Sequence, residues 1–375
     1  MMKSLRFSNH MAARLFLAAV FLLTLSAGLA GSAAAASEEA FGAVYTLTNA
    51  ASGNEVLVYK RSSDGSIAYQ GAYATGGLGS GAGLGSQTAV ILSKNNHWLF
   101  AVNAGSNQVS AFAVNADGLE LVDVVDSGGI LPVSLTTYKD RLYVLNAGGS
   151  GNISGFAIGQ DGSLSPLAGS TQPVSNGGVG AAPGPAQVAF NSDGSALVVT
   201  EKTTNLIDTY EVVDGVAGAP VTHASEGSTP FGFAFDRQNH AIVSEAASGS
   251  VSSYEIAGGE FEVISSAIPN GQAAACWIAI SNNGNFAYTT NAGSGSISSY
   301  RIGADGSLTL LDATAGLTGA GSSPLDMAFS NNGAFVYTLA SGVHNIMVFQ
   351  IGADGSLSNL GTVDVPVGVA GLAAR

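Results

Sequence analysis

Apolar and polar residues alternate along the chain in a pattern that repeats seven times. Each repeat holds an apolar stretch, a short polar turn and a second stretch in which every other residue is apolar. Alternation with a period of two is typical of a β-strand with one buried face, so we expect a pair of strands in each repeat. The repeats begin at Val44, Leu99, Leu142, Leu197, Ala241, Phe286 and Phe335.

The second strand of each pair leads into a glycine turn. Six repeats carry Asp-Gly at this point, and the fifth carries Gly258-Gly259. These dipeptides supply the positive φ that a tight hairpin needs, so a further strand should follow each turn. The Asp-Gly turns lie at 64–65, 117–118, 161–162, 214–215, 305–306 and 354–355.

Another apolar strand separates consecutive repeats, as in PAQVAFN, PFGFAFD, CWIAISN and PLDMAFS. Each unit therefore has four strands over roughly 43 to 55 residues, a period that indicates propeller blades rather than one long sandwich. The 51 glycines among 375 residues agree with a chain that turns this often. We predict an all-β fold, a seven-bladed β-propeller with four-stranded blades.

The two ends of the repeat region complement each other. The chain starts its first blade at a second strand, 43–49, and its last segment, GVAGLAA, aligns with the first strands of other blades. The C-terminal strand should therefore complete the N-terminal blade and close the ring. This predicts one propeller domain over 37–375 and, because no sheet edge is left open between the first and last blades, a monomer.

The first 36 residues have the features of a secretory signal peptide. Lys3, Arg6 and Arg14 precede an apolar run, and small residues follow up to Ala36. That run is too short to span a bilayer, and no second long apolar run follows it. We expect cleavage near Ala36, a secreted or periplasmic protein, and no membrane insertion.

Charge and composition exclude several function classes. The formal net charge is -14, which argues against nucleic-acid binding. A single cysteine, Cys276, rules out a disulfide framework and a cysteine-based zinc site, and we expect it to be a buried thiol. The sequence holds no G-x-S-x-G, H-E-x-x-H or P-loop motif. The glycine-rich run 76–86 is expected to form a flexible loop between blades.

A candidate site lies where the first strand of each blade begins and the second strand ends, at one mouth of the channel. The positions at the start of the first strands carry no acid or base. The ends of the second strands are mostly amides or carboxylates, and the ligand-binding candidates among them are Asn103, Asn146, Glu201, Glu245 and Asn291.

Each residue type at these strand ends has an alternative role. Asparagine there often caps a turn through its own backbone. Glu201 and Glu245 could instead share a proton, bind a cation or face water. They are the two catalytic candidates, and Lys202 and Asp208 nearby are interpreted as solvated pairs or turn supports.

The blade pattern, the D-G-S-L turns and segments such as IVSEAASGSVSSY resemble the seven-bladed propeller lactonase family. That family includes 6-phosphogluconolactonases and carboxymuconate-lactonizing enzymes, and YVTN-type surface propellers look similar. The resemblance covers the whole chain after the signal and implies a mouth cluster of His, Arg, Glu and a second Arg. On this sequence the four positions fall at Ala186, Phe231, Glu245 and Asn291, so only the glutamate is retained.

Three functions remain open. The first is a binding or scaffold propeller that has lost the His and Arg positions and takes a small-molecule or carbohydrate ligand. The alternative is an active extracellular lactone hydrolase with a rebuilt site, in which Glu245 or Glu201 acts as general base with or without calcium. The third is an adhesive surface protein that acts through its rims. No cofactor other than calcium is implied.

Overall fold

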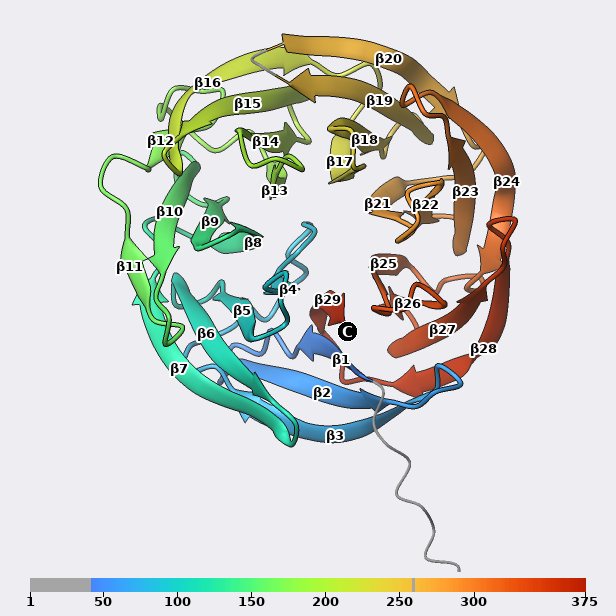
Figure 1. Ribbon diagram of the computed structural model, residues 1–375, viewed down its shortest axis with the longest axis horizontal. Helices are drawn as coiled ribbons and strands as arrows, with labels where there is room; N and C mark the ends of the chain where they lie inside the picture. Colours follow the sequence, from blue (N-terminus) through green and yellow to red (C-terminus); the bar gives the residue numbers. More distant parts are fainter. Residues whose placement is uncertain (1–41, 258–259) are drawn as a thin grey trace, which may run out of the picture. The chain divides into compact units, whose positions relative to one another are not determined.

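The computed structural model describes residues 42–257 and 260–375, and these form seven antiparallel sheets arranged as a ring, as Figure 1 shows. The described residues contain strands and no helix. None of their elements is a helix that could cross a membrane. The predicted seven-bladed β-propeller is confirmed. The expected signal peptide and the Gly258-Gly259 turn lie outside the described residues.

We number the blades from 1 to 7. In blades 2 to 7 the strands follow chain order outward from the central channel, whereas the innermost strand of blade 1 comes from the C-terminus. Blade 1 combines β29 (Ala370–Ala374) with β1 (Gly42–Leu47), β2 (Glu55–Arg61) and β3 (Ile67–Ala74). Blade 2 holds β4 (Val90–Leu92), β5 (Trp98–Asn103), β6 (Gln108–Asn115) and β7 (Gly118–Asp126). Blade 3 holds β8 (Pro132–Tyr138), β9 (Arg141–Asn146), β10 (Asn152–Ile158), β11 (Leu164–Pro166) and the short β12 (Gln172–Pro173).

The remaining blades have four strands each. Blade 4 holds β13 (Pro185–Phe190), β14 (Ala196–Glu201), β15 (Leu206–Val213) and β16 (Val216–Ala224). Blade 5 holds β17 (Pro230–Phe235), β18 (His240–Glu245), β19 (Ser250–Ala257) and β20 (Glu260–Pro269). Blade 6 holds β21 (Ala275–Ile280), β22 (Phe286–Asn291), β23 (Ser296–Ile302) and β24 (Leu308–Leu317). Blade 7 holds β25 (Pro324–Phe329), β26 (Phe335–Ala340), β27 (Asn345–Ile351) and β28 (Leu357–Asp364).

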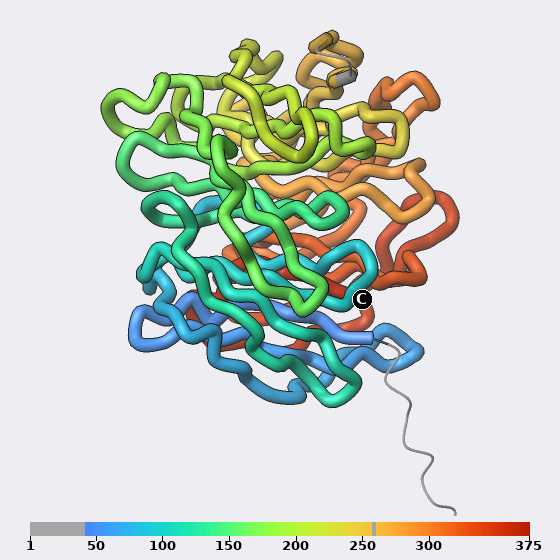
Figure 2. Tube along the Cα trace, turned by 60° about the vertical axis from the view of Figure 1, so that its left-hand side comes forward, coloured from blue at the N-terminus to red at the C-terminus, as the bar shows by residue number. Residues whose placement is uncertain are grey.

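The ring is closed as the sequence predicts. Strand β29 pairs antiparallel with β1, so Ala374 lies opposite Val44 and Ala370 opposite Leu47. The blue N-terminal strands and the red C-terminal strand lie side by side in Figures 1 and 2. The first and last blades therefore leave no unpaired inner edge between them.

The core lies mainly between neighbouring blades, where the apolar faces of adjacent sheets meet. Buried tyrosines cross these contacts and bond to the Asp-Gly turns of the next blade. Tyr337 donates to the Gly65 carbonyl and Tyr288 donates to the Gly355 carbonyl, each at a distance of 3.0 Å. The turn glycines have the positive φ expected of them, for example 88° at Gly65. The turn sequence that marks the repeat in the chain thus also joins the blades.

Candidate functional site

The five predicted ligand residues all end second strands, as expected, but their side chains lie between blades. Each side chain forms hydrogen bonds to the loop that connects the preceding blade to its own blade, or to a polar group next to that loop. Each side chain has an exposed fraction of 0%. Their contact with a ligand stays a prediction, because a ligand could reach them only by displacing these internal bonds. The five are Asn103, Asn146, Glu201, Glu245 and Asn291.

Asn103 shows how the asparagines are used. Its Oδ1 accepts hydrogen bonds from Asn54 (3.0 Å) and Thr75 (2.6 Å), which belong to the segments around β2 and β3 of blade 1. Its Nδ2 donates to Ser110 at 2.7 Å. Asn291 is bonded in the same way, accepting from Asn270 and donating to Ser298. These amides join neighbouring blades, because a buried amide needs all of its partners.

Glu201 anchors the loop between blades 3 and 4. Its carboxylate accepts from the Ser175 backbone N–H at 3.0 Å, and from the hydroxyls of Ser175 and Thr204 at 2.6 Å each. Its acidic neighbour is Asp208 on β15, rather than Glu245 as the sequence suggested. Burial and the Glu201 carboxylate raise the pKa of Asp208 to about 8, so Asp208 holds a proton near neutral pH.

Of the two roles considered for Asp208 and Lys202, solvated pairs or turn supports, the first is wrong. Asp208 is fully buried, and only one of its carboxyl oxygens has a hydrogen-bond donor, the Thr222 hydroxyl at 2.9 Å. Lys202 donates from Nζ to the Gly85 carbonyl and lies 5.1 Å from the centre of the Phe231 ring. Burial lowers the pKa of Lys202.

Glu245 lies in the contact between blades 4 and 5. Its Oε1 accepts from the Ser225 hydroxyl at 2.6 Å and from Tyr254 at 3.4 Å. Its Oε2 has no hydrogen-bond partner among the described residues. Burial raises the pKa of Glu245 to about 7, so it is a carboxyl that titrates in the range useful for acid–base chemistry.

The end of the glycine-rich segment reaches across the mouth of the channel. Figure 1 shows the segment before β4 reaching into the middle of the ring. Both polar groups of the Gln87 amide bond to the Ile278 backbone, with Nε2 donating at 2.7 Å and Oε1 accepting at 3.1 Å. The Trp277 indole N–H donates to the Ser86 carbonyl at 2.9 Å. The segment is a loop between blades 1 and 2, as predicted, but these bonds across the ring hold it in place rather than leaving it flexible.

An apolar cluster lies beneath this loop and includes Ala186 and Phe231, two of the four positions that the family resemblance singled out. Ala186, Phe231, Cys276 and Trp277 pack together, and the rings of Phe231 and Trp277 are 4.7 Å apart. The cysteine is free and buried, as predicted, and burial raises its pKa to about 12. These four side chains offer apolar contact, and the one N–H among them, that of the Trp277 indole, already donates to Ser86 rather than facing a developing oxyanion.

Asp326 is a candidate that the sequence reasoning missed. It lies on β25, and with Trp277, Leu325 and Ser341 it lines a cavity of about 310 Å³ beside the loop. Its Oδ1 accepts from the Thr88 backbone N–H at 3.3 Å, and burial raises its pKa to about 7. The available signal was that Asp326 is the only charged residue within the seven innermost strands.

The carboxylates do not come together as a metal site. In residues 42–257 and 260–375, no group of three or more His, Cys, Asp or Glu side chains gathers around one point. Glu201 and Glu245 are each bonded to hydroxyl groups in a different blade contact. The calcium ion considered from the sequence therefore does not fit these two residues as joint ligands.

Comparison with known proteins identifies the family. The family model for the seven-bladed β-propeller lactonases matches residues 44–371. Comparison with curated proteins finds no match.

Solved structures share the fold at low sequence identity. A candidate 6-phosphogluconolactonase from Bacteroides fragilis is 20% identical with a TM-score of 0.68, and the match covers 89% of this chain and 98% of that one. The periplasmic gluconolactonase PpgL of Pseudomonas aeruginosa is 18% identical with a TM-score of 0.65, covering 87% and 98%. A protein from Lactobacillus plantarum is 18% identical with a TM-score of 0.70, covering 89% and 99%. Identities this low show the fold alone, but the family match spans nearly all of the propeller. The chain belongs to the lactonase family of seven-bladed β-propellers.

Proposed function

We propose that this protein is an exported member of the lactonase family that acts by binding rather than by hydrolysing lactones. The main observation in support is that a loop of the chain itself fills the mouth of the channel. The segment 83–87 is bonded across the ring above Ala186 and Phe231, where the family positions would place a histidine and an arginine.

The chemistry of lactone hydrolysis supports the same conclusion. Opening a lactone needs a base for the attacking water and positive charge or hydrogen-bond donors near the developing oxyanion. Lys202 is the cation beside this mouth, and its ammonium is already bonded to the Gly85 carbonyl. Glu245 is held inside a blade contact by Ser225 and Tyr254. Neither group is placed to act on a substrate in the channel.

Proton release in weak buffer tests this proposal directly. We expect the protein without its first 36 residues to hydrolyse a panel of sugar and acyl lactones no faster than buffer alone, with or without calcium. Glu245→Gln and Asp326→Asn, checked for folding by their unfolding curves, should be indistinguishable from the parent protein. Turnover in the parent protein that either substitution removes would overturn the proposal.

An enzyme with a rebuilt site is the second candidate, and Asp326 is the observation in its favour. A buried carboxyl with a pKa of about 7 that lines a cavity has the properties of a general acid or base. In that case the rate should depend on Asp326 and follow a titration near neutral pH. Loss of turnover in Glu245→Gln alone would instead identify the glutamate that the family alignment retains.

Export is part of the proposal and rests on residues 1–36. Their basic, apolar and small-residue order is typical of a cleaved signal. One structural relative is a periplasmic protein, so this fold is found outside the cytoplasm. Expression of the full chain in a bacterial host should yield an exported protein whose N-terminal residue is Ser37. Recovery of the intact chain only from the cytoplasm would contradict this.

A further inference from the structure

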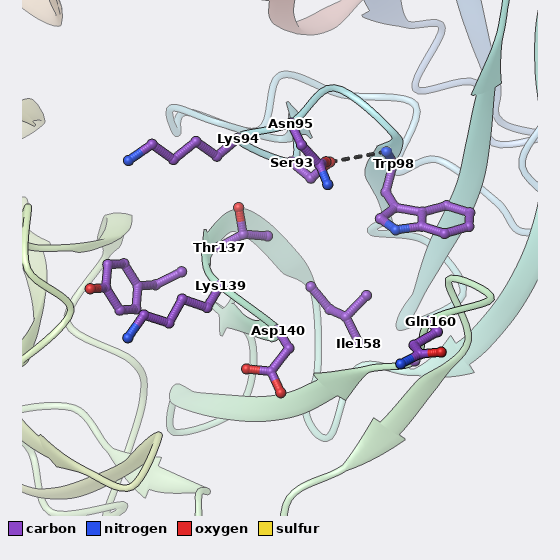
Figure 3. Close-up of a pocket in the computed structure, with 11 residues that line it drawn as sticks. Ser93, Lys94, Asn95, Trp98, Thr137, Lys139, Asp140, Ile158 and Gln160 are labelled. Atoms are coloured by element: carbon purple, nitrogen blue, oxygen red, sulfur yellow. Dashed lines mark hydrogen bonds between the residues drawn. The ribbon is translucent and has the colours of Figure 1, made fainter.

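A second cavity lies between blades 2 and 3, on the face opposite the inter-blade loops. The turn between β4 and β5 forms one side, and the turns after β8 and β10 form the other. Its volume is about 520 Å³, within the range of small-molecule sites. Its lining residues are drawn in Figure 3, and none of them belongs to the channel mouth.

One wall of the cavity is apolar and ordered by packing. Trp98 and Ile158 form this wall, and the turn at Gly162 lies so close to the indole that a Cβ there would meet the ring. The indole is partly exposed, so it offers a fixed flat surface to a ligand.

Two lysines lie on the other side of the cavity. Figure 3 shows Lys94 and Lys139 extending to the same side, away from Trp98. Asp140 does not neutralise them, because its carboxylate pairs with Arg141 at 2.7 Å. The Lys139 ammonium lies 5.1 Å from the centre of the Tyr138 ring. The whole chain has a net charge of -14, so two neighbouring lysines form a locally positive area on an acidic protein. Such an area attracts an anionic ligand.

Lys139 also occupies an unusual backbone position. Its φ is 52°, in the left-handed region, whereas the corresponding turn of blade 4 places Gly194 there and that of blade 5 places Asn239. A lysine with this φ carries a conformational cost.

The remaining polar groups of the cavity are free to bind. The Gln160 amide, the Thr137 hydroxyl and the Nδ2 of Asn95 have no hydrogen-bond partner among the described residues. Together with the lysines they form a set rich in donors, which suits a ligand with several oxygen acceptors.

A neighbouring cavity extends the site. It lies between blades 3 and 4, has a volume of about 490 Å³ and shares the turn Tyr138–Asp140 with the first. Phe190 and Arg141 line it, together with the acidic residues Asp193 and Asp214. A ligand longer than one ring could therefore extend over this turn, with Arg141 as the cation of the second cavity; an acidic unit placed beside Asp193 and Asp214 would be repelled.

We propose that this face binds an acidic oligosaccharide built from uronate units. The carboxylates bind Lys94 and Lys139, the hydroxyls bind Gln160, Thr137 and Asn95, and the apolar side of a sugar ring packs on Trp98. An aromatic carboxylate would use the lysines and the indole but would leave the amide groups unpaired. The site is independent of the channel mouth, so it stands whether or not the mouth hydrolyses lactones.

Intrinsic fluorescence can report binding, because the chain has two tryptophans and only Trp98 lines this cavity. The probe is trigalacturonate, which is titrated into the protein spanning residues 37–375. We expect a saturable change in emission that disappears in Trp98→Phe, with weaker binding of monomeric galacturonate. Calorimetry on Trp98→Phe separates loss of the signal from loss of binding.

Lysine variants test the recognition itself. Lys94→Gln combined with Lys139→Asn, which tolerates the positive φ, should weaken trigalacturonate binding by about tenfold or more. Lys60→Gln, which removes an exposed lysine from blade 1, should leave binding unchanged. Four outcomes would each overturn the proposal. Two concern other ligands: equal affinity for a neutral galactose trisaccharide, or tighter binding of benzoate than of trigalacturonate. The other two are an unchanged affinity in the double variant and no saturable binding of trigalacturonate at all.

Discussion

Deleting residues 367–375 should abolish cooperative unfolding of the propeller. The deletion removes β29, the innermost strand of blade 1, and leaves the inner edge of β1 unpaired. Gel filtration should show an expanded or aggregated chain, and thermal unfolding should lack a sharp transition. Deleting Arg375 alone is the matched control: it loses the two backbone bonds of Arg375 to Ala43 and keeps all of β29, so it should preserve the sharp transition at a somewhat lower midpoint.

The size of this effect follows from what β29 contacts. Val369, Leu372 and Ala373 are buried against strands from both ends of the chain. A fully buried Val or Leu contributes about 1.5–3 kcal/mol, and the ladder to β1 is lost as well. Their sum is comparable with the total stability of about 5–15 kcal/mol for a typical protein. The strand is therefore expected to decide whether the ring forms at all.

A transposed variant separates ring closure from loss of a few side chains. The Arg375 N–H donates to the Ala43 carbonyl at 2.9 Å, so the end of β29 lies next to the start of β1. Moving residues 368–375 in front of Gly42 through an Asn-Gly turn keeps every β29 residue and makes the same pairing a hairpin. This variant should regain the cooperative transition. Cooperative unfolding of the truncated chain would show that closure by β29 is dispensable.

The fold was predictable because its signals are local and repeated. Alternation along each strand and Asp-Gly at the turns are properties of neighbouring residues, and seven repeats average out the exceptions. Small departures have local causes. The first strand ends at Leu47 rather than at 49, since Asn49 has a positive φ of 49°. The short β12 adds to the outer edge of blade 3 where β11 stops early.

The site was much less predictable because its contacts are not local. Ser86 and Trp277 are 191 positions apart, and nothing in a glycine-rich run shows which strand it will cross to. The strand-end asparagines were found correctly, but their sequence could not distinguish a side chain facing a mouth from one bonded inside a blade contact. Asp326 was overlooked because its neighbours in β25 are apolar, and only the closed ring places it beside a cavity.

Raising the pH from 5 to 8 should lower the free energy of unfolding by several kcal/mol. Three buried carboxyls cause this: Glu245 and Asp326, whose pKa values are each raised to about 7, and Asp208, whose pKa is also raised. Burial is the main cause in each case, and for Asp208 the Glu201 carboxylate adds to it. The unfolded chain releases these protons near pH 4.

The sign follows from where each proton is held. Between about pH 4 and pH 7 the folded protein keeps protons that the unfolded chain has lost, so the stabilisation is complete at low pH and declines as the pH rises. One pKa unit corresponds to about 1.4 kcal/mol, so a carboxyl moved from about 4 to about 7 contributes up to about 4 kcal/mol. Urea unfolding at pH 5, 6, 7 and 8 measures the decline as a falling midpoint with an unchanged slope.

Amide substitutions assign the decline to particular carboxyls. Asp326→Asn is neutral at every pH and can still accept the Thr88 N–H, so it should remove part of the decline and raise stability at pH 8. Asp354→Asn is the control: its carboxylate is fully exposed, and its bonds to Ser356 lower its pKa, so it titrates below this window. The decline should persist unchanged in that variant. A stability that rises between pH 5 and pH 8 would mean that the buried carboxyls are ionised in the folded protein, and each would then need a donor or cation beside it.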